Sequence, residues 1–155
     1  TLDGVFETNL DIEDHTDKQK PLYLPLLDYR KCFDFIVQEI VWGLAEWWGF
    51  PTGMLRLLTN FYQTLTSVFK FHGHFGKLWL RTNSLAQGCS FSIMLVNIPV
   101  TAWAKAILLK MPIALVSISP YVDDKVIRSG SFAHLEELLA RTVKFDRMIG
   151  HYLNF

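Results

Sequence analysis

Cysteine is scarce in this sequence, and neither sign of charge is in excess. The 155 residues include two cysteines, Cys32 and Cys89, which lie too far apart for a paired spacing. A disulfide framework is therefore excluded, and we expect an intracellular, reducing compartment. Basic and acidic residues number 15 each, so the net charge does not point to a class of partner.

Long apolar runs without charge are also absent. Asn97, Pro99 and Lys105 interrupt the most apolar region, 91–109, so within it no uncharged run reaches the roughly 18 to 20 residues that span a bilayer. We expect no membrane partner. The alternative, a small membrane-associated protein built on residues 91–118, would depend on detergent. The acidic, polar start of the chain does not resemble a secretory signal.

The balanced charge is unevenly distributed. Residues 1–20 hold six acidic residues and two lysines, which leaves 13 basic and 9 acidic residues in 21–155, a difference of +4. No sustained period is visible in 1–20, and we interpret this part as an exposed acidic lead-in, a solvated linker without regular structure. The moderately basic remainder suits a polyanionic partner.

Hydrophobic periodicity predicts the elements of 21–155. Leu22 to Leu27 is an apolar run of strand length. Apolar residues at helical intervals predict helices over 33–48, 52–65, 91–109 and 131–149, and residues 67–81 and 117–128 are typical of hairpins. This order predicts an α+β fold, an antiparallel sheet covered on one face by helices.

Two adjacent acids mark the second hairpin. Asp123 and Asp124 lie between two runs of strand-forming residues. Because side chains alternate faces along a strand, both acids cannot be buried on one side, and solvent or a cation must offset their repulsion. A divalent metal would do so, although most isolated Asp-Asp pairs are solvated turn residues.

Four motifs in the same order resemble those of reverse transcriptases, most closely those of non-LTR retrotransposons. Tyr-Val-Asp-Asp at 121–124 resembles the third palm motif, and 26–36, in which Phe33-Asp34 follows Asp28, resembles the first. Gln-Gly-Cys at 87–89, followed by Leu-Val-Asn at 95–97, is similar to the motif between them. Residues 150–154, Gly-His-Tyr-Leu-Asn, resemble the start of the fourth.

The resemblance implies a polymerase palm domain over 21–155, with incomplete fingers and no thumb. The function it implies is that of an RNA-directed DNA polymerase from a retroelement, acting on an RNA or DNA template with a primer and on deoxynucleoside triphosphates. We expect the chain to be part of a longer protein that supplies fingers, thumb and an endonuclease module. In a eukaryote, its place would be the nucleus or the cytoplasm.

The resemblance also implies a metal site. Asp28, Asp123 and Asp124 match the carboxylates that bind two Mg²⁺ ions, with Mn²⁺ as a substitute, in nucleotidyl transfer by two metals. Asp28 and Asp123 would bridge the ions, with Asp124 as a weaker or secondary ligand. Hard oxygen ligands of this kind suit Mg²⁺. The primer 3′-hydroxyl would attack the α-phosphate and release pyrophosphate.

Further positions follow from the same motifs. Phe33 would lie beneath the incoming sugar and exclude a 2′-hydroxyl, unless it is only a core residue of the first helical turn. Gln87 and Gly88 would approach the templating pair and the nucleotide, while Tyr121 and Val122 would flank the primer end. The basic residues of the first hairpin, Lys70, Lys77 and Arg81, would bind template or primer phosphates, or belong to an ordinary solvated hairpin.

Three prolines depart from the family pattern. Pro25 and Pro120 fall within predicted strands and Pro99 within a predicted helix, where proline removes a hydrogen bond. These prolines support an alternative interpretation, a catalytically decayed palm remnant that folds or binds nucleic acid without polymerising. The retained aspartates oppose it.

Overall fold

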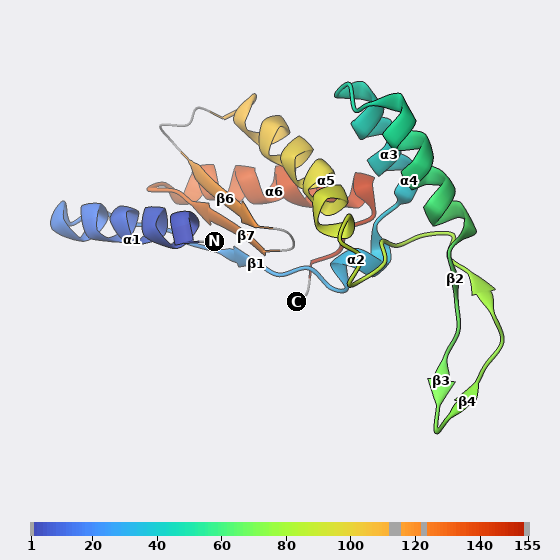
Figure 1. Cartoon of the computed structure of the whole chain (residues 1–155). Helices are drawn as coiled ribbons and strands as arrows, with labels where there is room; N and C mark the ends of the chain where they lie inside the picture. The colour runs from blue at the N-terminus through green and yellow to red at the C-terminus, as the bar shows by residue number, and fades with distance from the viewer. Residues whose placement is uncertain (1, 112–115, 122–123, 154–155) are drawn as a thin grey trace.

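The sheet at the centre of the chain is antiparallel, and helices cover one of its faces. The computed structural model describes residues 2–111, 116–121 and 124–153. The strands pair in the order β1 (Leu26–Leu27), β7 (Asp124–Arg128), β6 (Ser117–Tyr121). Figure 1 shows α5 (Ser92–Leu108) and α6 (Phe132–Ile149) on the same side of this sheet. The predicted α+β class with a helix-covered antiparallel sheet is confirmed.

The register of the sheet explains how two of the prolines are accommodated. The central strand β7 pairs with β1 on one side and β6 on the other, so Pro25 and Pro120 both belong to edge segments. Ile127 donates its backbone N–H to the carbonyl of Pro25, and the reciprocal bond is missing because proline has no N–H, so the edge segment loses one ladder bond. Lys125 is paired with Leu27 and faces β1 in the same way, so Pro120 opposite it has its nitrogen at the outer edge of β6.

The acidic start of the chain forms a helix, α1 (Leu2–Asp17), so the expectation of an irregular lead-in is corrected in this respect. Most of its described residues are exposed. The helix lies against the face of the sheet opposite to α5 and α6, where Gly4 approaches Ser119. Arg128, only 2% exposed, lies 3.0 Å from Asp11 and 3.4 Å from Glu7. These contacts with a residue more than 100 positions away hold the helix to the sheet.

The predicted helix over 33–48 is divided into α2 (Cys32–Phe35) and α3 (Gln38–Trp47). The backbone is extended at Ile36, and the N–H of Ser84 donates to its carbonyl. The carbonyl of Phe33 accepts a second such bond from Leu85. A segment distant in sequence therefore takes two carbonyls that a continuous helix would have used within itself.

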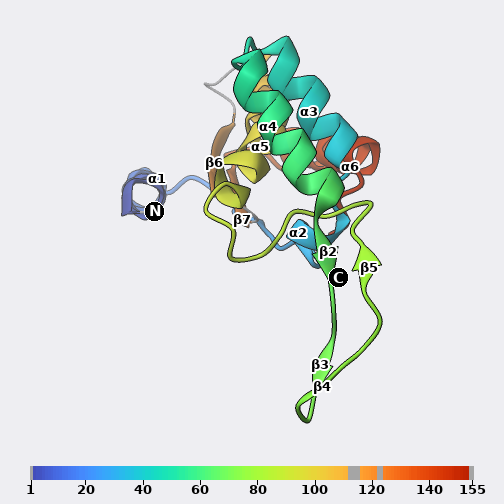
Figure 2. The ribbon, with the colours of Figure 1, turned by 45° about the vertical axis from the view of Figure 1, so that its right-hand side comes forward.

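A long hairpin projects from the end of α4 (Thr52–Thr64), as Figure 2 shows. We call residues 66–81 the arm. At its base β2 pairs with β5, and near its tip β3 pairs with β4. These strands are β2 (Thr66–Ser67), β3 (Lys70–Phe71), β4 (His74–Phe75) and β5 (Trp79–Leu80). The predicted hairpin is confirmed.

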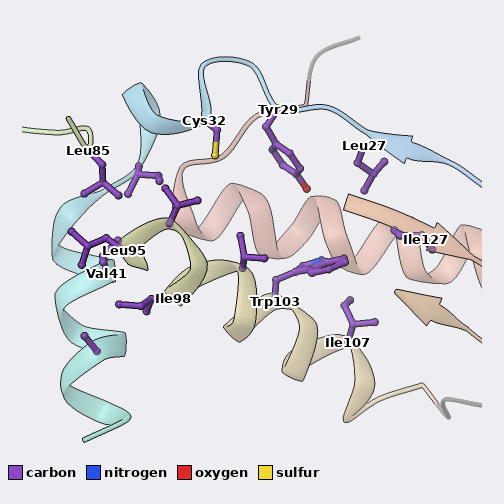
Figure 3. Close-up of a cluster of buried hydrophobic side chains, with 14 of the residues drawn as sticks. Leu27, Tyr29, Cys32, Val41, Leu85, Leu95, Ile98, Trp103, Ile107 and Ile127 are labelled. Atoms are coloured by element: carbon purple, nitrogen blue, oxygen red, sulfur yellow. The ribbon is translucent and has the colours of Figure 1, made fainter. Parts of the chain in front are cut away.

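The hydrophobic core lies between the sheet and the helices. Trp103 on α5 is fully buried, and Figure 3 shows it between Ile107 and the side chains of Tyr29, Leu27 and Ile127. The same core continues towards α3, through Leu95, Ile98 and Val41. The aromatic and aliphatic stripes of these helices are thus packing surfaces. In the described part of the chain, no helix combines the length and the apolar character needed to cross a bilayer.

Candidate active site

The strand register brings two of the predicted metal-binding acids to one end of the sheet. Leu27 is opposite Lys125 in the β1–β7 ladder. Asp28 directly follows Leu27, and Asp124 directly precedes Lys125, so these acids lie just beyond the last residue pair of the β1–β7 ladder. Both are exposed. The structure therefore places two of the predicted ligands, 96 positions apart in the sequence, next to each other at the end of the β1–β7 ladder.

Asp124 begins β7 and is paired with Tyr121, the last residue of β6. Asp123 and Val122, predicted as a metal ligand and a primer contact, lie outside the described residues. Within the ranges that are described, no group of three or more histidine, cysteine or acidic side chains could hold a metal ion. The proposed third carboxylate, however, is one of the residues not described.

The donor chemistry of Asp28 and Asp124 fits Mg²⁺ or Mn²⁺. Carboxylate oxygens are the hard ligands that these ions prefer, and Mg²⁺ keeps several water molecules, which requires ligands open to solvent. Two exposed carboxylates at one end of a ladder meet both conditions.

A cavity of about 570 Å³ lies between α1 and the face of the sheet opposite to α5 and α6, which we call the open face. Asp124 forms part of its wall. Leu26 and Val126 form its floor from paired positions of β1 and β7. The opposite wall belongs to α1, which contributes Asp3 and Glu7. The acidic helix therefore borders the approach to one of the candidate ligands.

Three of the predicted substrate-binding residues share a second cavity, of about 510 Å³. Phe33 lies in its wall together with Gln87 and Gly88. Phe33 is half-buried and packs against the hydrophobic core, so its ring belongs both to the core and to the cavity. Gly88 adopts a φ of +82°, which favours glycine, but a Cβ there would meet no atom within 4 Å. Its backbone conformation, rather than a close contact within this chain, requires glycine.

The predicted nucleic-acid contacts lie on the arm and are not brought together with the acids. Lys70 and Lys77 are exposed, and Lys70 lies over the ring of Phe75 at 5.5 Å. Arg81 lies at the base of the arm, half-buried, over the ring of Trp79. Figures 1 and 2 both show the arm extending away from the β1–β7–β6 sheet.

Sequence reasoning missed a buried polar network directly behind the two acids. Tyr29 donates a hydrogen bond of 2.5 Å to Asp146 on α6, and Lys125 donates to Tyr29 at 2.7 Å and to Asp146 at 2.9 Å. All three are buried. The signal was present, because strand alternation makes Tyr29 and Lys125 inward-facing and Asp146 lies on the apolar face of its helix, between Thr142 and Ile149.

Burial and charge shift the titration of this network. The pKa of Tyr29 is raised, because its hydroxyl is buried and lies beside the Asp146 carboxylate. Burial lowers the pKa of Lys125, and the adjacent Asp146 only partly offsets this effect. The ammonium also lies 4.5 Å from the ring centre of Trp103, which favours its charged form.

His151 lies next to the network, with its Nε2 3.8 Å from the sulfur of Cys32. Its ring is 3% exposed, and Nδ1 has no hydrogen-bond partner in the described part of the chain. Burial, together with the nearby Lys125 charge, lowers its pKa to about 4. His151 is therefore neutral at pH 7.

Comparison with known proteins relates the fold to a polymerase. No protein-family model matches the chain, and no curated protein matches it in sequence. Among solved structures it is similar to apo telomerase from Candida tropicalis, with a TM-score of 0.78 at 13% identity over 98% of the chain. A C-terminally truncated form gives 0.74 at 14% over 99%, and telomerase in complex with a TWJ fragment of telomeric RNA gives 0.77 at 13% over 99%.

The chain spans only about a third of the length of these structures: 30% of apo telomerase, 34% of the truncated form and 28% of the form in complex with RNA. Telomerase is a polymerase related to reverse transcriptases. The likeness extends over nearly the whole chain, but at this identity it establishes the fold and nothing finer. The chain has the fold of the matched part of these telomerase structures.

Proposed function

We propose that the chain is the palm-containing part of a reverse transcriptase of the non-LTR retrotransposon type, an RNA-directed DNA polymerase. The observation that carries the proposal is the register that sets Asp28 beside Asp124, at the end of a sheet whose fold resembles a polymerase. The sequence motifs supply Asp123 as the third acid. Template and primer, deoxynucleoside triphosphates, and the remaining domains of a longer protein would complete the enzyme.

In this proposal the three carboxylates bind two Mg²⁺ ions, with Mn²⁺ as a substitute. Bound ions would stabilise the attacking and leaving oxygens of an in-line displacement at phosphorus. The primer 3′-oxygen forms the new bond to the α-phosphorus, pyrophosphate leaves, and the hydroxyl proton passes to solvent. Tyr121 and Val122 flank the primer end.

The cavity shared by Phe33, Gln87 and Gly88 is the proposed place of the incoming nucleotide. The half-buried ring of Phe33 is fixed by the core, so it would present a rigid surface to the sugar. A 2′-hydroxyl would meet this surface, and deoxynucleotides would be preferred. Replacing Phe33 with alanine should raise ribonucleotide incorporation, whereas an unchanged sugar preference would contradict the assignment.

The experiment for the activity is primer extension on an annealed RNA template, using the longest natural polypeptide that contains this chain. Asp123→Ala should abolish extension, since one of the three carboxylates is lost. The matched control is Asp17→Asn, which removes an exposed carboxylate at the end of α1. Equal extension by wild type and Asp123→Ala would reject the proposal.

The alternative is a decayed palm that folds and binds nucleic acid without polymerising. The prolines support it, but Pro120 has its nitrogen at the outer edge of β6, where proline disturbs no ladder bond, and Pro25 removes a single donor, that towards Ile127, in an edge segment. This observation favours the active enzyme. A wild-type protein that binds template–primer but does not extend it would support the decayed palm.

A further inference from the structure

We infer that Tyr29, Lys125 and Asp146 form a positioning network that fixes the spacing of Asp28 and Asp124 and thereby the affinity of the site for a divalent cation. The inference rests on the proposed function, since it concerns the same two carboxylates. It assigns to Asp146, on α6, a role in a site formed by β1 and β7.

Side chains alternate between the two faces of the sheet along β7 and along the segment that continues β1. Asp28 and Asp124 are exposed, and the next residue in each segment, Tyr29 or Lys125, is buried on the helix-covered side. Each candidate ligand is thus one peptide unit from a member of the network. Displacing either buried side chain would move the carboxylate attached to the neighbouring Cα.

The hydrogen bonds of the network converge on Asp146. One carboxylate oxygen accepts from Tyr29 at 2.5 Å, and the other accepts from Lys125 at 2.9 Å. Lys125 also donates to the Tyr29 hydroxyl at 2.7 Å and lies 4.2 Å from the centre of its ring. A single side chain on α6 therefore links the two strands behind the acids.

The backbone pairing between β1 and β7 ends just before the two acids. The strand β1 comprises only Leu26 and Leu27, so Asp28 lies beyond the last residue of its strand. Tyr29 forms an isolated bridge with Leu153, away from β7. Side-chain contacts, rather than a continued ladder, therefore hold the end of β1 beside β7. Two adjacent carboxylates would otherwise separate, because their charges repel.

A buried ion pair is weak evidence for stability, because desolvation offsets much of its Coulombic gain. Apolar residues of similar size could fill the same volume between α5, α6 and the sheet. What they could not reproduce is the directional set of three hydrogen bonds, two accepted by the carboxylate oxygens of Asp146 and one by the Tyr29 hydroxyl. The network is therefore better explained by the geometry it imposes than by the stability it adds.

The test measures Mn²⁺ affinity on the 155-residue chain by electron paramagnetic resonance of the free ion, with unfolding followed by circular dichroism. The triple variant Tyr29→Phe/Lys125→Met/Asp146→Leu replaces the network without leaving a buried polar group unpaired. We expect it to unfold cooperatively like wild type while its Mn²⁺ affinity falls about tenfold, as for other groups that orient metal ligands.

The single variant Tyr29→Phe removes only the hydroxyl and should lower the affinity about threefold, a smaller loss of the same kind. Its matched control is Tyr62→Phe. Tyr62 is equally buried, and its hydroxyl lies 2.9 Å from Ser92 Oγ, but it does not adjoin the acids. This control should leave Mn²⁺ affinity unchanged.

The outcomes separate this inference from the proposed function. If wild type binds Mn²⁺ and Asp28→Asn weakens binding, but the folded triple variant binds like wild type, the positioning role is rejected and the metal site stands. If the triple variant does not fold, the Mn²⁺ affinities of Tyr29→Phe and Tyr62→Phe are compared instead. Equal Mn²⁺ affinities of these two single variants reject the inference. If Asp28→Asn binds Mn²⁺ as tightly as wild type does, the proposed metal site is rejected, and the inference is rejected with it.

Discussion

His151 shows how one buried residue makes the fold sensitive to acid. In the folded chain its pKa is lowered to about 4 by burial and the Lys125 charge, against 6.5 for an unperturbed histidine. The unfolded chain therefore binds a proton more readily than the folded chain. Stability attributable to this residue is present above about pH 6.5 and is lost as the pH falls towards 4.

We predict that the free energy of unfolding drops by about 3 kcal/mol between pH 7 and pH 4 on account of His151 alone. Urea unfolding at several pH values measures it. In His151→Gln, a side chain that does not titrate, the drop over this range should be smaller by about the same amount. If the variant and wild type show the same pH dependence, protonation of His151 does not lower the free energy of unfolding. The matched control is exposed His74→Gln, which should leave the curve unchanged.

The sequence motifs pointed to the residues of the candidate site, but not to the buried polar residues beside them. Asp28 and Asp124 were identified from motifs, and Phe33, Gln87 and Gly88 were found together in one cavity. Tyr29, Lys125 and Asp146 were missed, because their meaning depends on contacts between residues 21 to 117 positions apart. A polar residue at a core position is visible in a sequence, but its partner is not.

At the scale of elements, local periodicity was sufficient wherever an element is determined by its own sequence. The helices α4, α5 and α6 begin and end within two residues of their predicted limits. The errors occur where distant segments intervene. Arg128 holds α1 to the sheet, and the 84–85 segment divides the predicted helix over 33–48. Neither effect has a signal in the local pattern.

Gly150 ends α6 at the point where that helix meets the division between α2 and α3. Its φ is +79°, and an added Cβ would lie 2.9 Å from a methyl carbon of Val37 and 3.1 Å from the carbonyl oxygen of Phe35. Conformation and space both require glycine here. The end of α6 and the α2–α3 junction are therefore fitted to each other.

We predict that Gly150→Ala lowers the free energy of unfolding by about 2 to 4 kcal/mol, since a left-handed conformation and an overpacked contact both add cost. Gly49→Ala is the matched control, because Gly49 has a φ of +77° but no atom within 4 Å of an added Cβ. It should cost about 1 to 2 kcal/mol, the conformational part alone. Chemical denaturation of both variants gives the comparison, and equal losses would contradict the close contact.

At the scale of the whole molecule, the acidic cluster of α1 and the cationic arm are separated along the chain. The acids of α1 lie on the open face of the sheet, and the arm carries cations among exposed aromatic rings. Three phenylalanines of the arm are at least about two-thirds exposed: Phe69 at 74%, Phe71 at 77% and Phe75 at 67%. Exposed aromatic rings and lysines together suit a nucleic acid, in which phosphates and base faces are both available.

We predict that Lys70→Gln/Lys77→Gln weakens binding of an RNA–DNA template–primer duplex and reduces the salt dependence of binding. If each lysine neutralises one phosphate, the slope of log K against log salt concentration should fall in magnitude by about 2. Fluorescence anisotropy at several salt concentrations measures the slope. The control Lys20→Gln/Lys110→Gln removes two exposed lysines outside the arm, so net charge changes equally. A similar loss in both double variants would show that net charge, and not the position of the arm, governs binding.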